Sequence, residues 1–174
     1  VLQKARTNVA VVLDRGLGEP KRILVPVGGG PHSRMALRLA NEIAISDGAT
    51  VTALRLITAP TTGDDEEVEE DQKALLADIV EEALGGVPTS FNLEVRHAAT
   101  VPKGILEASQ SGYELVVIGS SEEWSLDTSL LGTVDDWIAE RVPCSVVFCR
   151  RYEPVAIAWL RYRVKRMGDA YDHE

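Results

Sequence analysis

The chain has 174 residues and a formal net charge of −9, and 45% of its residues are hydrophobic. This length predicts one domain with short additions, large enough to bury a full core. The negative charge argues against a general nucleic-acid-binding protein, because phosphates would be repelled overall. No apolar run reaches the roughly 18 residues of a membrane span, and no leader resembles a signal peptide. We therefore expect a cytoplasmic location, and the start at Val1 is consistent with a piece of a longer protein.

Strand and helix patterns alternate along the chain. The strands are short apolar runs bounded by glycine or proline, whereas the helices carry apolar residues at three- and four-residue spacing. In chain order, the expected strands are Asn8–Leu13, Arg22–Val27, Thr50–Ile57, Phe91–Ala98, Glu114–Gly119 and Ser145–Arg150. The expected helices are Ser33–Ile45, Asp65–Leu84, a short helix opened by Pro102, and Thr133–Arg141.

This alternation predicts a doubly wound α/β fold with a mostly parallel sheet covered on both faces. We expect five strands from Arg22 onward, an extra N-terminal strand at Asn8–Leu13 and a C-terminal helix. The extra strand is expected to cover a sheet edge, either in its own subunit or in a partner's. In such sheets ligands bind past the carboxyl ends of the strands, where the strand order reverses. The loops to examine are therefore Gly28–Gly30 and Gly119–Gly132.

Gly132-Thr133-Val134 stands at an expected helix start and has the makeup of a phosphate-binding turn. Glycine lets a ligand approach the backbone, and the unpaired first-turn amides and the helix dipole favour an anion. Thr133 would add a hydroxyl; alternatively, it caps its own helix with Asp136 in a capping box. Gly28-Gly29-Gly30 is open to the same two interpretations, because a tight strand-to-helix turn needs glycine without any ligand.

Catalysis and metal binding find little support in the sequence. Neither loop carries a Ser-His-Asp arrangement, a P-loop lysine or paired carboxylates, and Arg34 is the basic residue near the glycine turn. Ser33 follows His32, but neighbours in sequence do not make a catalytic dyad. The three histidines are scattered without metal-ligand spacing. We expect neither an enzyme nor a metal site.

Cys149 falls in the last expected strand, and Cys144 directly precedes Ser145 and is taken as part of the same extended stretch. Five residues of strand separate them by about 16 Å, which is too far for a disulfide. An internal bridge is therefore excluded if the strand is correct. Two free thiols fit a reducing cytosol.

Four segments in this order resemble the universal stress protein family: RILVPV (Arg22–Val27), ELVVIGS (Glu114–Ser120), Gly132-Thr133-Val134 and PCSVVFCR (Pro143–Arg150). The resemblance covers about Lys21 to Arg151 and implies an adenine-nucleotide α-hydrolase-like fold. It divides the chain into a leading strand and linker (1–20), the universal stress protein domain (21–151) and a basic C-terminal helix or tail (152–174). Members that bind ATP carry Gly-x2-Gly-x9-Gly-(Ser/Thr) after the fourth strand, and this spacing recurs here from Gly119 to Thr133.

The resemblance also implies the residues of a nucleotide site. The nucleoside pocket would be lined by Pro26, Val27 and Leu56, with Gly28 at the position beside the ribose. The phosphates would face the second loop and the helix after it, at Gly119, Ser121, Gly132, Thr133 and Val134.

Two departures from the family pattern predict a degenerate or altered pocket. Glu122 replaces the second glycine of the motif, and its carboxylate would repel a triphosphate by about 1 kcal/mol or more. Gly28 replaces an aspartate that contacts the ribose, which removes a charged hydrogen bond worth about 1.5–3 kcal/mol. Together these losses weaken binding by roughly two to three orders of magnitude. We expect weak or altered binding of ATP, ADP or AMP.

The basic tail suggests a regulatory role. Val155–Met167 is apolar at first and then basic, so it would lie on an anionic membrane surface or on a partner helix, or dock on its own domain. Such a domain resembles those fused to bacterial membrane transporters, which predicts a cytosolic regulatory domain of a transport protein, contacting its membrane portion. The alternative is a free-standing, ATP-binding stress-response sensor, and a carrier of another small molecule also stays open. Family members usually pair their last strands, which implies a homodimer.

Overall fold

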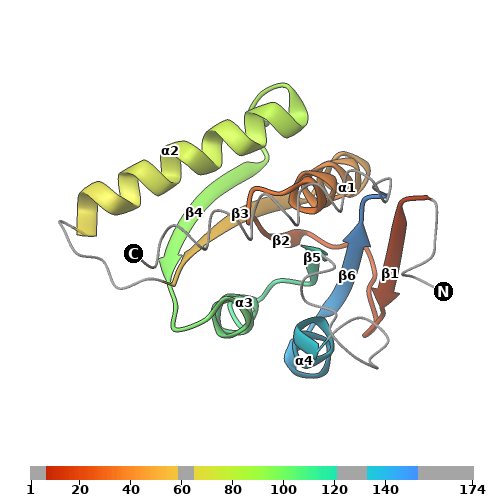
Figure 1. Ribbon diagram of the computed structural model, residues 1–174. Coiled ribbons are helices and arrows are strands. Elements are labelled where there is room, and N and C mark those ends of the chain that lie inside the picture. Colours follow the sequence, from red (N-terminus) through yellow and green to blue (C-terminus); the bar gives the residue numbers. More distant parts are fainter. Residues whose placement is uncertain (1–6, 59–64, 121–132, 153–174) are drawn as a thin grey trace.

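The computed structural model describes residues 7–58, 65–120 and 133–152, and of Asp65 and Thr133 only the backbone (Figure 1). Within these residues the strands are β1 (Val9–Leu13), β2 (Arg22–Pro26), β3 (Thr50–Ile57), β4 (Phe91–His97), β5 (Leu115–Gly119) and β6 (Ser145–Arg150). The helices are α1 (Pro31–Asp47), α2 (Asp65–Leu84), α3 (Val101–Ser109) and α4 (Thr133–Arg141). The predicted order of elements is confirmed. The first helix begins two residues earlier than predicted, because proline fits the first turn, where its missing N–H costs nothing.

The described strands form one sheet in the order β1-β6-β5-β2-β3-β4. The five strands from β2 to β6 run parallel to one another, whereas β1 runs antiparallel to β6. Helices α1 and α2 cover one face, and α3 and α4 cover the other (Figure 1). This is the expected doubly wound fold, with five strands and one added at the N-terminus. The strand order reverses between β2 and β5, which places the crevice for a ligand at their carboxyl ends.

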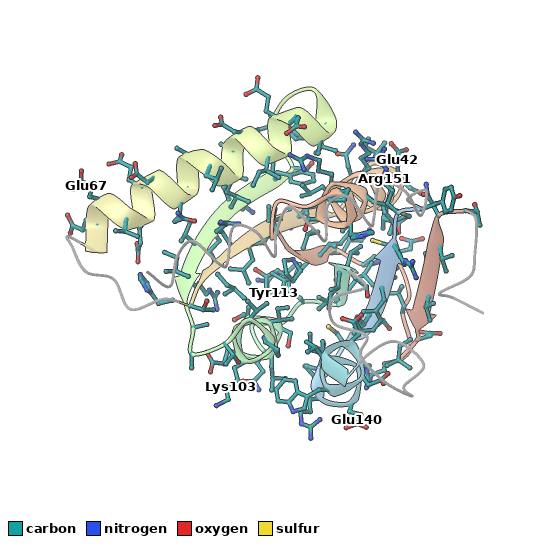
Figure 2. The ribbon with its side chains drawn as sticks, viewed as in Figure 1. Glu42, Glu67, Lys103, Tyr113, Glu140 and Arg151 are labelled. Carbon is teal, nitrogen blue, oxygen red and sulfur yellow. The ribbon has the colours of Figure 1, made fainter. Side chains whose placement is uncertain are left out.

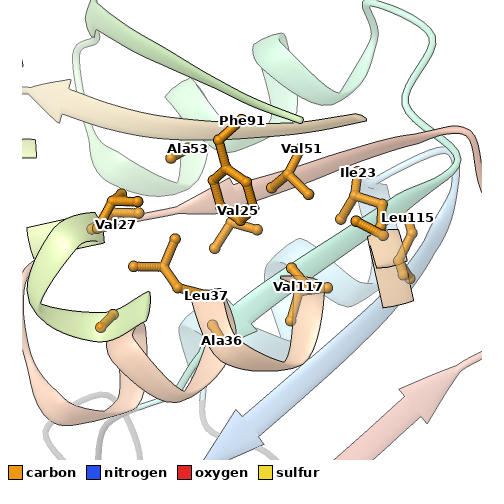
Figure 3. Close-up of a cluster of buried hydrophobic side chains, with 14 of the residues drawn as sticks. Ile23, Val25, Val27, Ala36, Leu37, Val51, Ala53, Phe91, Leu115 and Val117 are labelled. Atoms are coloured by element: carbon orange, nitrogen blue, oxygen red, sulfur yellow. The ribbon is translucent and has the colours of Figure 1, made fainter. Parts of the chain in front are cut away.

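Strand β2 supplies both hydrophobic cores. Ile23, Val25 and Val27 pack into the core beneath α1 and α2, which Figure 3 shows with Leu37 of α1. Leu24 turns to the opposite face and packs beneath α3 and α4. Because both faces of the strand are buried, its sequence is a nearly continuous apolar run instead of an apolar–polar alternation.

The extra strand covers a sheet edge in its own subunit, as one of the two predicted arrangements. β1 pairs with β6 over a register that runs from Val9 opposite Arg150 to Leu13 opposite Val146. Hydrogen bonds close both ends of the pair: the Tyr152 N–H donates to Asn8 Oδ1 (2.9 Å), and the Arg15 N–H donates to Ser145 Oγ (2.8 Å). The Arg15 guanidinium also donates to Ala139 O (2.5 Å) near the end of α4.

The position of β1 bears on the expected homodimer. β6 has β5 on one side and β1 on the other, so a second copy would have to displace β1 or add to the outer edge of β1. Val12 on that outer strand is 56% exposed. The dimer itself stays a prediction.

Several other expectations can be compared with the described residues. Cys144 and Cys149 are both free, as predicted, although Cys144 lies one residue before β6 and not within the strand. In the described part of the chain, no helix is both long enough and apolar enough to span a membrane. The expected C-terminal helix and basic tail from Val155, and the loop residues Ser121, Glu122 and Gly132, lie outside the described residues.

Candidate functional site

The glycine turn after β2 is closed by the first turn of α1. The Gly28 N–H donates to Ser33 Oγ at 3.1 Å, and Ser33 is 8% exposed. Gly29 has a φ of 90°, which requires glycine. The turn therefore has a structural reason for part of its glycine content, while Gly28 itself is exposed.

Arg34 does not offer a free positive charge at this turn. Its guanidinium donates to Gly29 O at 2.6 Å and to the Glu82 carboxylate of α2 at 2.5 Å. The Arg34 side chain thus fastens the glycine turn to α2. A second arginine lies nearby, which the sequence analysis missed: Arg55 of β3 donates to Val27 O (3.4 Å) and to Gln72 of α2 (2.9 Å).

The end of β5 touches the start of α1. A Cβ placed on Gly119 would lie 2.5 Å from His32 O and from Ser33 N. Such a distance is far inside normal contact, so glycine is needed for this close approach. Gly119 and the Gly28–Gly30 turn thereby meet at the point between β2 and β5 where the strand order reverses.

The first turn of α4 joins the same region through a buried carboxylate. The Ser120 hydroxyl, directly after β5, donates to Asp135 Oδ2, and the Ser120 N–H donates to Cys149 O at 2.9 Å. Asp135 is wholly buried, with 0% exposure. Burial raises the pKa of Asp135 to about 6; the Ser120 hydrogen bond lowers it and the charge of Asp136 raises it further.

Asp135 was not among the residues predicted for the site, although the sequence around it carries a signal. Ile138 and Val142 are buried, and they follow Asp135 by three and seven residues. This spacing places Asp135 and Ile138 on one face of α4, and Val142, directly after the helix, donates its N–H to Ile138 O. The two acids of the first turn, Asp135 and Asp136, resemble a solvated helix start, and the apolar positions that follow reveal which of the two points inward.

The predicted nucleoside-lining and phosphate-facing residues are divided between the two faces of the sheet. Val27 belongs to the core beneath α1 and α2, whereas Leu56 and Val134 pack against the core beneath α3 and α4. Pro26 shares the α3–α4 face, because it lies two residues after Leu24 on the same strand. The Leu56 methyls lie 2.8 and 2.9 Å from where a Cβ on Gly104 would stand, so Leu56 packs closely on α3.

A shallow pocket lies on this α3–α4 face. Its volume is about 290 Å³, and it is lined by Thr100, Pro102, Lys103, Val134 and Trp137. Val134 is thus shared between the predicted phosphate-facing residues and the pocket. Figure 2 shows Lys103 at the outer surface of α3, where it supplies a positive charge that the sequence analysis did not single out.

The predicted site residues that are described therefore fall into two groups at one end of the sheet. Gly28, Gly119 and Val27 lie where β2, β5 and the start of α1 meet, and Val27 is held by its N–H donating to Leu54 O at 2.8 Å. Pro26, Leu56 and Val134 lie on the α3–α4 side. Thr133 is the first residue of α4, and the predicted capping box that involves its hydroxyl is outside the described side chains.

A family model supplies the identification. The model for the universal stress protein family matches residues 19–150. The chain belongs to the universal stress protein family. The chain is 28% identical over 142 residues to SH1215 of Staphylococcus haemolyticus, which is named as a universal stress protein. The match covers 76% of this chain and 86% of that protein.

Solved structures of universal stress proteins share the fold. One, in complex with cAMP, superposes with a TM-score of 0.56 at 18% identity, covering 74% of this chain and 95% of that chain. Another, from Archaeoglobus fulgidus in complex with dAMP, has a TM-score of 0.52 at 16% identity and covers 74% of this chain and 96% of that one. At this level of identity the comparison shows the fold alone.

Gly28 departs from the pattern of this universal stress protein family, and the surrounding geometry does not require a glycine there. A Cβ on Gly28 would meet one atom within 4 Å, Ser33 Oγ at 3.7 Å, which is an ordinary contact. The backbone at Gly28 has no positive φ that would require glycine. Packing therefore leaves room for a side-chain Cβ at this position.

Proposed function

We propose that this chain is a cytoplasmic universal stress protein domain that binds an adenine nucleotide with low affinity at the carboxyl ends of β2 and β5. The observation that carries the proposal is the meeting of the glycine turn, Gly119 and the first turn of α4 at the reversal of strand order. Related folds have been solved with cAMP and dAMP, which supports a nucleotide as the ligand. Low affinity follows from Gly28, which offers no side chain to a ribose.

Binding without catalysis is part of the proposal. The Ser33 hydroxyl accepts the Gly28 N–H, whereas His32 Nδ1 accepts the Arg151 N–H at 3.0 Å. The two neighbouring side chains thus bond to different backbone groups instead of to each other. Arg34, the basic residue of the turn, is bonded to Gly29 and Glu82, which leaves the backbone amides as the main anion-binding groups here.

The proposal is tested by isothermal titration of ATP, ADP and AMP into the wild type and Gly28→Asp. An aspartate at this position restores a charged hydrogen bond worth about 1.5–3 kcal/mol, so we expect AMP to bind roughly 10- to 100-fold more tightly. Gly18→Asp is the charge-matched control, because Gly18 is exposed, has no positive φ and has open space around it. If no nucleotide binds to the wild type or to Gly28→Asp at millimolar concentration, the proposed function is wrong. Micromolar ATP affinity of the wild type would contradict the low affinity.

Attachment to a membrane transporter is a second hypothesis about the protein as a whole. It rests on the apolar and basic pattern of Val155–Met167, and it proposes that the domain regulates transport by contact. A free-standing nucleotide sensor is the simpler alternative, and the comparisons favour it, because the related structures are of similar length to the matched region. The full-length reading frame distinguishes the two: membrane spans before Val1 would favour the transporter, and a start codon close to Val1 would exclude that order of domains.

A further inference from the structure

Asp135 is an unusual residue to bury at the start of a helix. Its side chain is wholly inaccessible, and the buried Ile138 follows it within α4. A buried carboxylate is costly unless its oxygens are bonded. Asp135 is therefore either compensated by neighbouring groups or held in its protonated form.

The compensation is incomplete in the part of the chain that the structure describes. Asp135 Oδ2 accepts the hydroxyl of Ser120, and Oδ1 has no hydrogen-bond partner. The helix N-terminus and this unpartnered, buried oxygen lie at the junction of β5 and α4, where the proposed nucleotide site is formed. A carboxyl that gains a proton at Oδ1 removes the buried charge and gains a donor.

The charged groups around Asp135 do not neutralise it by direct pairing. On α4 itself, Asp136 is a second negative charge and raises the pKa of Asp135. The neighbouring elements carry further ionisable residues: Lys103 on α3, His32 and Arg34 on α1, Cys149 and Arg150 in β6, and Arg151 directly after β6. Burial raises the pKa of the Cys149 thiol to about 12, so this group stays neutral. Among the described residues, Asp136 is the one whose charge shifts the Asp135 carboxyl.

The geometry points to Asp135 as a proton-binding residue of the nucleotide site, so that the domain takes up a phosphate-bearing ligand together with one proton on the Asp135 carboxyl. The proton comes from solvent and adds to the unpartnered oxygen, and no covalent bond to the ligand forms or breaks. This inference rests on the proposed function and adds a regulation to it. Nucleotide would be held more tightly as the pH falls.

The physical reason is the repulsion between two negative charges. A phosphate at the first turn of α4 disfavours the ionised form of Asp135, which raises its affinity for a proton. By linkage, the protonated carboxyl favours the phosphate by the same factor. The pKa of about 6 in the free domain places this exchange between roughly pH 5 and 8. A coupling of ordinary size gives an affinity about 5- to 10-fold higher at pH 5.5 than at pH 7.5.

The test is isothermal titration of AMP and of cAMP between pH 5.5 and 7.5 into the folded chain. The phosphate of AMP takes up its own second proton near pH 6, whereas the diester of cAMP has no such proton, so cAMP isolates the protein's contribution. The variants are Asp135→Asn, which keeps the shape without the charge, and Asp135→Ser, which serves if the amide disturbs folding. Asp136→Asn is the matched control, because it removes one acid from the same turn; since the charge of Asp136 raises the pKa of Asp135, this variant should keep the pH dependence with its midpoint at lower pH.

The expected result is a pH-dependent affinity in the wild type and in Asp136→Asn, with a flat profile for cAMP in both Asp135 variants. Repeating the cAMP titration at pH 6.5 in buffers of different ionisation enthalpy should show proton uptake on binding in the wild type and none in Asp135→Asn. If nucleotide binds and the Asp135 variants keep the wild-type pH dependence, the inference is overturned while the proposed function stands. If no nucleotide binds to the wild type at any pH and none binds to Gly28→Asp, the inference and the proposed function are both overturned.

Discussion

The close approach of β5 to α1 makes Gly119→Ala a sensitive test of how the site is built. The added Cβ would lie 2.5 Å from His32 O and Ser33 N. These are backbone atoms, so no side-chain rotation relieves the clash. Either the end of β5 or the first turn of α1 must move by roughly 1 Å to restore ordinary contact, and such overpacking costs typically about 1–3 kcal/mol.

We expect Gly119→Ala to lower the melting temperature by about 2–12 °C, because 1 kcal/mol corresponds to roughly 2–4 °C in a domain of this size. Differential scanning calorimetry or thermal unfolding by circular dichroism measures the shift. Gly28→Ala is the control within the site, since its Cβ would lie 3.7 Å from Ser33 Oγ, and Gly18→Ala is the control in open space. Both controls should stay within about 0.5 kcal/mol of the wild type. If Gly119→Ala melts within about 1 °C of both controls, which corresponds to less than about 0.5 kcal/mol, the close contact between β5 and α1 is refuted.

Two further predictions concern stability and assembly. Burial raises the folded-state pKa of Asp135 from 3.8 to about 6, so the folded domain binds more protons than the unfolded chain between these values. The residue therefore destabilises the fold as the pH rises through that window, and most above it. Asp135→Asn should unfold at higher urea than the wild type at pH 7.5, by up to about 3 kcal/mol, and the difference should shrink toward pH 4.5. An equal difference at both pH values would contradict this. Removing residues 1–15 takes away β1 and the Arg15 hydrogen bonds to Cys144 and Ala139, and this exposes the backbone edge of β6. We expect a lower melting temperature and a concentration-dependent association that light scattering detects. Unchanged stability together with unchanged mass would show that β1 has no covering role.

The fold was predictable because its signals are local. Each strand of the parallel sheet is an apolar run, and each helix has its own apolar stripe, so the order of elements follows from short stretches of sequence. The covering strand was also predictable as a strand. Its assignment to its own subunit was not, because the sequence Asn8–Leu13 pairs equally well with an edge of the same chain or of a second one; the hydrogen bonds from Arg15 and Tyr152 decide it.

The site was predictable in its position and less so in its chemistry. The glycines at 28 and 119 pointed to the correct end of the sheet, because carboxyl ends of parallel strands meet there. The role of Arg34 depended on Glu82, which is distant in sequence and comes close in the fold. Leu56 and Val27 were expected to line one pocket, yet their side chains point to opposite faces of the sheet.

The sequence by itself determined the fold class, the order of the elements and the family, because these depend on periodicity, turn residues and motif spacing along a continuous stretch. The tertiary structure alone decided which polar groups are paired and which are left buried without a partner. Asp135 shows the difference: its neighbours along the chain resemble an exposed helix start, and its pKa depends on the burial that results when α4 packs on the sheet beside Ser120. Desolvation is a property of the surrounding atoms in space, which come from segments far apart in the chain.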